Sequence, residues 1–489
     1  MFAPFRHVTR IIRAAYTLAE YDALVPREFA AHMPAGAIWA SRLLQALSRR
    51  KDAGAAPQAT PGRRLAAALH DLGPAYIKLG QFLATRPDII GADVATGLGT
   101  LQDRLPPFAQ AEAEAIIAED LGAPTITMFD DFGPAVAAAS IAQVHRARIA
   151  GAPAGSPDVA VKILRPGIER AFMAGLAAWD WAARRAERLW PAARRLEPVK
   201  FVATLRDSVL IEMDLRLEAA AASELKENDA ERKLLRIPTV DWQRTARRVM
   251  TLEWIDGISL RDRDALKAAG HDPRALAERV MNMFLHQALF DGFFHADLHQ
   301  GNLFADRDGN LVAVDFGIMG RLDRATRRYL AEILYGFLMR DYQRLAAIHF
   351  DPGYVPPHQS RDAFAQALRS VGEPIFGQDV SKISMARLLA QLFAITETFD
   401  MHLQPQLVLL QKTMVVVEGV ARDLDPRLNM WEVSRPVVTR WMEQEMSPEA
   451  RMRQAAEGAA AGAAALGRIL SELPETLRNV ETIAAMIRR

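Results

Sequence analysis

The spacing of apolar residues changes along the chain. Between residues 63 and 121 apolar positions recur every three or four residues, which predicts helices with a turn at Gly73 and Pro74. From about Phe129 the spacing shortens, and the stretches SIAQVHRARI and VAVKIL alternate or contain β-branched residues. Residues 151–158 supply a loop between them. This order predicts an antiparallel hairpin.

The second half of the chain returns mostly to helical spacing. Residues 200–235 contain no proline or glycine and predict one long helix. RVMTLEWIDG predicts a buried strand, and ALAERVMNMFLHQALF predicts a core helix. NLFAD and LVAVD predict two short strands joined by the turn RDGN, and from Asp323 onward nearly everything is helical. We therefore expect a small strand-rich lobe and a larger helical lobe, with polar residues where they meet.

The first residues predict an amphipathic helix. Its apolar positions recur at helical spacing and arginines lie alongside them: Phe5, Val8, Ile12, Ala15 and Leu18, with Arg6, Arg10 and Arg13. Such a helix either lies on a membrane surface or packs on the rest of the fold. Amphipathic helices mostly face a core, which favours packing.

Composition excludes several classes of protein. The 489 residues are 50% apolar and 24% charged, an ordinary globular balance, and the net charge of +1 gives no sign of a nucleic-acid partner. No cysteine is present, which excludes disulfides, a thiolate nucleophile and cysteine-ligated metals. The most apolar stretch, LVLLQKTMVVVEGV, is interrupted by Gln411, Lys412 and Glu418 and predicts a buried helix.

One segment, residues 293–320, carries an unusual set of polar residues. Asp297 precedes Asn302 by five positions, and Asp315 follows a predicted strand and precedes Phe-Gly. Phosphoryl transfer from a nucleotide needs an acid beside the attacking hydroxyl and oxygen ligands for Mg²⁺. Each residue alone could simply cap a turn. Together, in a strand and loop context, they predict Asp297 as the catalytic acid and Asn302 and Asp315 as metal ligands.

A lysine upstream completes this set. The stretch VAVK places Lys162 on a strand, where it could contact the α and β phosphates of a nucleotide. Its acidic partner should come from the stretch IEMDLRLEAAAASEL. On one helix Glu212 and Asp214 project about 200° apart, whereas Asp214 and Glu218 share a face. Helix geometry therefore leaves the partner of Lys162 open.

The expected phosphate loop departs from the usual kinase pattern. A kinase has G-x-G-x-x-G there, because glycines let backbone N–H groups approach the phosphates. This chain has AVAAASIAQVHRA instead, with Ala137, Ala138, Ala139 and Ser140 at the expected turn. The loop should be stiffer, and a nucleotide should sit differently against it.

These motifs resemble the UbiB/aarF/ADCK family of atypical kinase-like proteins. The family's marks follow in order between about residues 72 and 429: KLGQ, AAAS, VAVK, EMD, HADLHQGN and DFG. The resemblance implies an α+β, protein-kinase-like two-lobed fold with a small strand-containing N-lobe, a helical C-lobe and added N-terminal helices. It also implies that ATP and Mg²⁺ are bound.

The resemblance assigns further roles. Lys78 and Gln81 of the KLGQ motif would reach toward the acids of the EMD motif and fill the place of a peptide substrate. Glu253 and Ile255 would lie at the nucleotide. The implied activity is that of an ATPase, or a kinase of small or lipid substrates, that supports ubiquinone biosynthesis. The implied partners are ATP and ADP, membrane lipids or polyprenyl quinone intermediates, and other quinone-biosynthesis proteins, with no nucleic acid.

The predicted divisions follow from these motifs. They are an N-terminal helical region that could contact a membrane surface (1–50), a linker (51–62), a helical extension with the KLGQ motif (63–125), the N-lobe (126–257), the C-lobe (258–445) and a helical tail (446–489). Bacterial members of the family often end in two hydrophobic helices. The tail here has only ten uncharged residues between Glu457 and Arg468, so we expect peripheral attachment to the cytoplasmic side of the bacterial inner membrane, or a truncated chain.

Two other functions fit part of this pattern. Small-molecule phosphotransferases of the aminoglycoside or choline kinase type have a similar catalytic loop, but neither the AAAS loop nor the KLGQ helix belongs to them. A non-catalytic scaffold that binds nucleotide or lipid is the other alternative. Lys162, Asp297, Asn302 and Asp315 are all present, which argues against a dead site.

Overall fold

The computed structural model contains two compact units, each described here by itself. The first comprises Met1–Lys226, Ile237–Ile255 and Asp315–Gly317, and the second Glu227–Arg236, Asp256–Val314 and Ile318–Arg489. The structure describes residues 3–23, 60–84, 90–99, 101, 105–153, 155–190, 194, 197–351, 353–376, 391–392, 395, 398–401 and 405–445. Most of the predicted linker and all of the predicted tail lie outside these residues.

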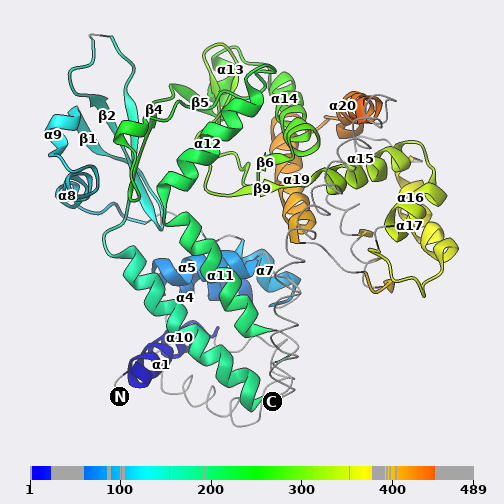
Figure 1. Cartoon of the computed structure of the whole chain (residues 1–489), viewed down its shortest axis with the longest axis horizontal. Coiled ribbons are helices and arrows are strands. Elements are labelled where there is room, and N and C mark those ends of the chain that lie inside the picture. Colours follow the sequence, from blue (N-terminus) through cyan, green and yellow to red (C-terminus); the bar gives the residue numbers. More distant parts are fainter. Residues whose placement is uncertain are drawn as a thin grey trace, which may run out of the picture. The chain divides into compact units, whose positions relative to one another are not determined.

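The first unit contains a four-stranded antiparallel sheet (Figure 1). Its order is β1 (Phe129–Ala138), β2 (Ala142–Ile149), β3 (Val159–Leu164) and β4 (Val249–Glu253). The predicted hairpin is confirmed, because β2 pairs with β3 and places Val144 opposite Lys162. Since β3 also pairs with β4, the backbone around Lys162 is fixed from both sides.

Two apolar clusters cover the sheet. One contains α8 (Gln110–Leu121), which follows the predicted bounds closely and packs Ile116 and Ile117 among buried residues of the strands. The other joins strand residues to α10 (Ile168–Leu189) and α11 (Pro198–Glu212), with Phe172 and Leu205 fully buried. A short helix, α9 (Thr125–Met128), precedes β1, and a 3₁₀ turn (Trp242–Arg244) precedes β4.

The single helix predicted over residues 200–235 is wrong. The structure has two helices there, α11 and α12 (Leu215–Asp229), separated by Met213 and Asp214. The Leu215 amide donates to the carbonyl of Arg247 (2.9 Å), and the Asp214 carboxylate accepts the Arg216 amide (3.2 Å). These bonds replace the helical ones at the break. Glu212 and Glu218 therefore belong to different helices, and the angles expected on one helix do not apply.

Three helices lie between α1 and α8 in the described part of the chain: α4 (Pro61–Leu72), α5 (Pro74–Ala84) and α7 (Ala92–Leu98). The predicted turn lies between α4 and α5, where Gly73 has a φ of 98° that favours glycine. Helices α4 and α7 approach very closely. A Cβ atom added at Gly62 would lie 2.7 Å from the Cα atom of Gly97 and from the Val94 carbonyl oxygen.

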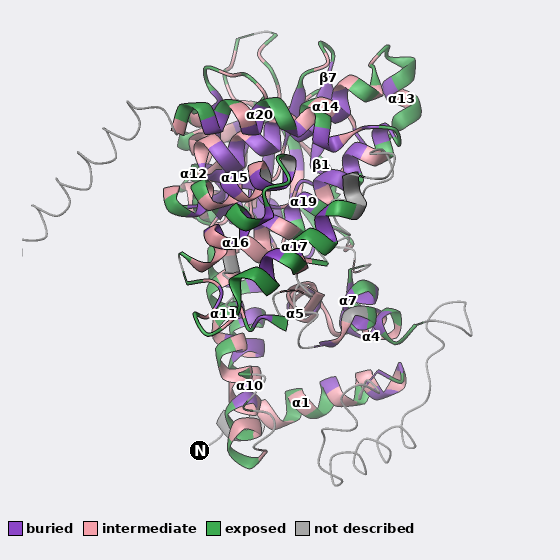
Figure 2. Cartoon of the chain, turned by 90° about the vertical axis from the view of Figure 1, so that its right-hand side faces the viewer, coloured by how far each residue is buried: buried purple, intermediate pink, exposed green. Residues whose placement is uncertain are grey.

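The first helix, α1 (Ala3–Glu20), packs on α4 and α10, which confirms the packed interpretation. The predicted apolar face is only partly right. Ile12 is 55% exposed, whereas Ala14 and Ala19 are buried, because small side chains allow the close approach to neighbouring helices. Figure 2 shows that exposed, intermediate and buried positions all occur along α1. The side chains of Phe5 and Arg6 lie outside the described part.

The second unit has short strands among helices. A three-stranded sheet has the order β5 (Gly257–Ser259), β7 (Leu303–Asp306) and β8 (Leu311–Ala313), and β6 (Phe293–His295) pairs with β9 (Met319–Arg321). The predicted β7–β8 hairpin is confirmed. The helices described in this unit are α13 (Arg263–Ala268), α14 (Pro273–His286), α15 (Arg324–Leu338), α16 (Tyr342–Phe350), α17 (Arg361–Phe376), α19 (Pro405–Leu424) and α20 (Met430–Glu445).

The apolar stretch near residue 410 forms α19, as predicted for a buried helix. Met414, Val417 and Val420 are buried, whereas Lys412 and Val415 face solvent. Within the described part of the chain, no helix is both long and apolar enough to cross a bilayer.

The contact between α4 and α7 predicts a stability effect. Gly62→Ala should destabilise the protein by about 1–3 kcal/mol, because the new methyl group meets backbone atoms that cannot rotate away. Gly419→Ala is the matched control: Gly419 is also helical, has no atom within 4 Å of an added Cβ, and should be neutral or stabilising by up to about 1 kcal/mol. Thermal unfolding of both variants would test this. Equal melting temperatures would contradict the close approach.

Candidate active site

Lys162 of β3 lies at the centre of a charge cluster in the first unit. Its Nζ atom is 2.6 Å from Glu218 Oε1 and 3.6 Å from Asp315 Oδ1. Glu218 comes from α12 and its side chain is 8% exposed. The question that the sequence left open is thereby answered: the partner of Lys162 is Glu218, and neither Glu212 nor Asp214.

Neighbouring charges in this cluster shift the pKa values of Lys162 and Glu218. Burial would lower the pKa of Lys162, but the carboxylates of Asp315 and Glu218 outweigh that effect and raise it. Burial raises the pKa of Glu218, and the Lys162 ammonium opposes this. Lys162 therefore stays protonated at neutral pH.

The DFG segment is bound to the same cluster. The Gly317 amide donates to Asp315 Oδ1 (3.0 Å), and the Phe316 amide donates to Glu218 Oε1 (3.4 Å). Phe316 is buried, whereas the side chain of Asp315 is 46% exposed. The turn thus orients the Asp315 carboxylate and still leaves it open to a ligand.

The alanine-rich loop follows from the pairing of β1 and β2. Ala137 and Ala138 end β1, and Ala139 with the buried Ser140 begins the turn. The Ala139 amide donates to the Ala142 carbonyl (2.7 Å), and Arg165 Nε donates to the Ala139 carbonyl (2.8 Å).

Arg165 is a residue that sequence reasoning missed. It also donates from its backbone amide to Ile141 and from its guanidinium to the carbonyl of Pro106, both at 2.8 Å. The sequence signal for this role was the position of Arg165 directly after β3. The β2–β3 register pairs Leu164 with Ala142, so the residue after Leu164 lies beside the turn that precedes β2. Arg165 therefore holds the alanine-rich turn in place.

The KLGQ helix contributes a second ion pair. Lys78 Nζ of α5 lies 2.5 Å from Glu212 Oε2 at the end of α11, and both side chains are largely buried. This contact is the one that the resemblance implied for the motif lysine. Gln81 lies one turn further along α5 and is half-buried.

The other two acids have their own partners. Asp214 accepts two hydrogen bonds from the guanidinium of Arg216 (2.8 and 2.6 Å), and these bonds lower its pKa. Glu253 ends β4, where its carboxylate accepts the amide of Thr239 (3.2 Å). Ile255, two residues on, is half-buried. Of the three acids considered for Lys162 from the sequence (Glu212, Asp214 and Glu218), only Glu218 therefore forms an ion pair with it.

The second unit holds the catalytic-loop motif. After β6, the Asp297 amide donates to His295 Nδ1 (3.1 Å), and Asn302 Nδ2 donates to the Asp297 carbonyl (3.2 Å). The Asn302 carbonyl in turn accepts the amide of Val314, the residue before Asp315 (3.2 Å). Because the Asn302 side chain uses its nitrogen in this way, its oxygen is available to a metal ion.

His299 is a second residue that the sequence did not assign. Its Nδ1 accepts the Gly301 amide (3.0 Å), which places the proton of a neutral ring on Nε2. That atom lies 3.9 Å from Asp297 Oδ2. The ring therefore points its N–H toward the carboxylate expected to act on the hydroxyl.

The Asn302 side-chain oxygen in the second unit and the Asp315 carboxylate in the first are each the type of oxygen ligand that Mg²⁺ takes, and this ion commonly takes one or two protein oxygens and completes its shell with phosphates and water. Within the described residues, no group of three or more His, Asp or Glu side chains is arranged to hold a metal ion by itself. Neither unit therefore offers, among its described residues, a complete protein cage for a metal ion.

Two family models match this chain. The ABC1 atypical kinase-like domain matches residues 100–349, and the UbiB helical domain matches residues 368–429. The chain belongs to the UbiB family of atypical kinase-like proteins. Its relatives include proteins named "Probable protein kinase UbiB" from Marinobacter nauticus, 42% identical over 80% of this chain and 72% of the relative, and from Aeromonas salmonicida, 40% identical over 86% and 78%.

A solved structure shares the UbiB-family fold. It is the complex of Rv3197 with erythromycin from Mycobacterium tuberculosis, with a TM-score of 0.51 and 22% identity, covering 76% of this chain and 93% of that one. At this identity the likeness concerns the fold alone. It agrees with the kinase-like α+β class expected from the sequence.

The ion pair of Lys162 with Glu218 predicts that substitutions of Glu218 and Asp214 lower the free energy of unfolding by different amounts. Glu218→Gln should destabilise the protein by about 1–3 kcal/mol, because it leaves a buried ammonium with one carboxylate fewer. Asp214→Asn should cost at most about 1 kcal/mol, because the side chain of Arg216 is 57% exposed and water can solvate it. Chemical denaturation of both variants would measure the difference. A larger cost for Asp214→Asn would contradict the assignment.

Proposed function

We propose that this protein is an ATP-binding atypical kinase or ATPase that uses Mg²⁺ and supports ubiquinone biosynthesis. The observation that carries this proposal is the contact of Lys162 with Glu218 and Asp315, since a strand lysine paired to a helix glutamate beside the DFG aspartate is the arrangement that an active kinase requires. In this proposal Lys162 binds the α and β phosphates, Asp315 and Asn302 hold Mg²⁺, and Asp297 acts on the attacking hydroxyl or water.

The proposed acceptor is water or a lipid, such as a polyprenyl quinone intermediate, and not a protein. Lys78 is engaged by Glu212 within the first unit, and the alanine-rich turn is held by Arg165, so both elements are fixed before any substrate arrives. A stiff loop restricts how the γ-phosphate can be presented, and positioning supplies most of the rate of phosphoryl transfer. The extraction of lipid intermediates from a membrane would fit the same site.

The proposed location is the cytoplasmic face of the bacterial inner membrane, with peripheral attachment. Helix α1 supports this proposal. Its solvent-facing residues combine two cations with two large apolar side chains: Arg10, Ile12, Arg13 and Tyr16. Basic and apolar side chains on one exposed face are typical of helices that lie on anionic lipid.

The proposed roles of the two aspartates predict different defects. Asp315→Asn should abolish binding of Mg-ATP, because it removes the charge that holds the ion on the phosphates. Asp297→Asn should leave binding nearly unchanged and reduce turnover, since this residue serves the hydroxyl or water. Calorimetry and an ATP hydrolysis assay with lipid vesicles would measure both effects.

Asp308→Asn is a suitable control for these variants, because Asp308 is an exposed residue in the β7–β8 turn. It should change neither binding nor hydrolysis. If Asp297→Asn and Asp315→Asn lose binding equally, the assigned roles are wrong. If the unchanged protein binds Mg-ATP but never hydrolyses it, the scaffold interpretation replaces the enzymatic one.

The exposed face of α1 predicts salt-sensitive membrane binding. Each arginine should contribute about 1 kcal/mol to association with anionic vesicles, so Arg10→Glu with Arg13→Glu should weaken it at least about thirtyfold. The exposed pair Lys267→Glu with Arg307→Glu, in the second unit, provides a charge-matched control. Vesicle flotation at low and high salt would compare them. Equal weakening by the two pairs would show that net charge, and not α1, determines binding.

A further inference from the structure

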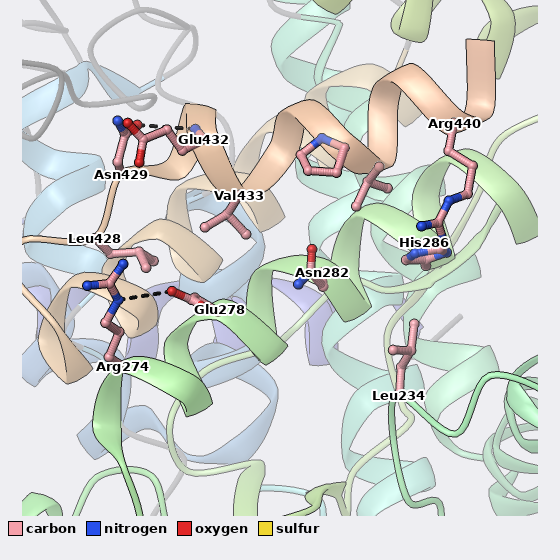
Figure 3. A pocket seen from close by; sticks show the side chains of 12 residues that line it. Leu234, Arg274, Glu278, Asn282, His286, Leu428, Asn429, Glu432, Val433 and Arg440 are labelled. Carbon is pink, nitrogen blue, oxygen red and sulfur yellow. Dashed lines mark hydrogen bonds and ion pairs between the residues drawn. The ribbon is translucent and has the colours of Figure 1, made fainter. Parts of the chain in front are cut away.

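The second unit contains a cleft between α14 and α20 that no role above uses (Figure 3). It encloses about 450 Å³, within the usual range for small-molecule sites. Helix α14 lines it with one row of polar residues at four-residue spacing: Arg274, Glu278, Asn282 and His286. Most other residues of α14 are buried in the core, so the row is a polar strip on an otherwise apolar helix.

The two ends of this row differ. At one end Arg274 Nε donates to Glu278 (3.0 Å), so these charges satisfy each other. At the other end, as Figure 3 shows, Arg440 of α20 reaches toward His286, and Asn282 points into the cleft. Neither Arg440 nor Asn282 makes a side-chain hydrogen bond or ion pair with another residue in the described part of the chain.

Among the described residues, the charges that act on His286 are those of Arg232 and Arg440, so this end of the cleft is electropositive. His286 Nδ1 is buried and has no hydrogen-bond partner among the described residues. Burial, together with Arg232 and Arg440, lowers the pKa of His286 to about 4, so the ring is neutral at physiological pH. Arg232 is paired with Asp291, which leaves Arg440 as the cation facing the cleft. A buried polar atom without a partner is costly. An anion there would accept from the Arg440 guanidinium and, with the ring proton on Nδ1, from His286 as well.

The wall opposite the polar row is apolar in its middle. Val433, Pro436 and Val437 of α20 line it together with Leu428 before the helix, whereas Asn429 and Glu432 line its far end, on the side of Arg274 and Glu278 (Figure 3). Pro436 lies inside α20 and has no N–H, so it cannot donate to the Glu432 carbonyl one turn earlier. The cleft thus joins an electropositive end to a wall with apolar side chains.

We propose that the α14–α20 cleft binds a small amphiphilic anion. Its carboxylate or phosphate contacts the Arg440 guanidinium, the Asn282 amide and His286 Nδ1, and its apolar body lies along Val433 and Val437. A guanidinium is suited to this role because its fork matches the two oxygens of a carboxylate or phosphate. The proposal does not depend on nucleotide binding, since none of these residues belongs to the candidate active site.

Calorimetry on the full chain without nucleotide would test the site. The probes are octyl phosphate and octanoate below their micelle concentrations, inorganic phosphate as the anion alone, and octyl glucoside as the neutral amphiphile. We expect the two amphiphilic anions to bind about tenfold or more tightly than either incomplete probe, because only they use both the charge and the apolar wall. If the neutral amphiphile binds equally well, or no probe binds, the proposal is overturned.

Two variants of α20 locate the site. Arg440→Gln should weaken octyl phosphate binding about tenfold or more, because a charge-assisted hydrogen bond is lost. Arg435→Gln, an exposed arginine on the same helix outside the cleft, should not change it. Asp315→Asn should also bind the probe normally, which separates this site from the nucleotide site. Equal weakening by Arg440→Gln and Arg435→Gln would overturn the assignment, and equal melting temperatures would confirm that both variants fold.

The source of the anion can be distinguished by competition. Vesicles of phosphatidylcholine with phosphatidic acid should displace octyl phosphate if the occupant is a lipid headgroup, whereas only soluble octyl phosphate or octanoate will compete if it is a free metabolite. Either result supports an amphiphilic-anion site. Displacement by phosphatidylcholine vesicles alone would show that charge is not recognised and would overturn it.

Discussion

The first unit depends on the charge balance around the Lys162 ammonium. An isolated cation taken out of water costs several kcal/mol, so the fold must supply carboxylates at short range. Lys162 cannot move to find them, because β3 is paired on both sides. Helix α12 must therefore bring Glu218 to it, and the short segment Asp315–Gly317 belongs to this unit although its flanking residues belong to the other.

The break between α11 and α12 places the acids Glu212, Asp214 and Glu218 in different surroundings. Glu212 forms an ion pair with Lys78, Glu218 with Lys162, and Asp214 with Arg216. Each buried ammonium thus has its own carboxylate. Because α11 and α12 are joined by only two residues, a shift of either helix would move the carboxylate partners of both Lys78 and Lys162. The break between the two helices therefore connects the KLGQ helix to the strand lysine. This link gives a physical reason for the family's two motifs to act together.

Much of this fold could be predicted because its signals are local. The β2–β3 and β7–β8 hairpins follow from alternation and turn residues, and α8 and α14 follow from apolar spacing. The break after Met213 could not be predicted in this way, since the sequence there favours a helix and the bond that ends it comes from Arg247, more than thirty residues away. Tertiary contacts override local preference at such points.

The same contrast holds for the candidate site. The motifs predict the positions of Lys162, Asp297, Asn302 and Asp315, because each of these residues lies in a short characteristic stretch of sequence. The sequence did not predict their ion-pair partners, since an ion pair depends on where helices and strands meet in space and not on their spacing along the chain. The outward face of α1 also escaped prediction, because the packed face is set by small residues such as Ala14 and Ala19, which contribute little to an apolar pattern.

The alanine-rich loop shows how a motif acts through residues outside it. Methyl groups alone would stiffen the turn by restricting its backbone. The structure adds a second restraint, since the Ala139 amide is committed to Ala142 and its carbonyl to Arg165. An N–H group that already donates within the turn is not free to approach a phosphate. Removing a methyl from Ala138 therefore would not by itself recreate a glycine-rich loop, because Arg165 would still hold the turn closed.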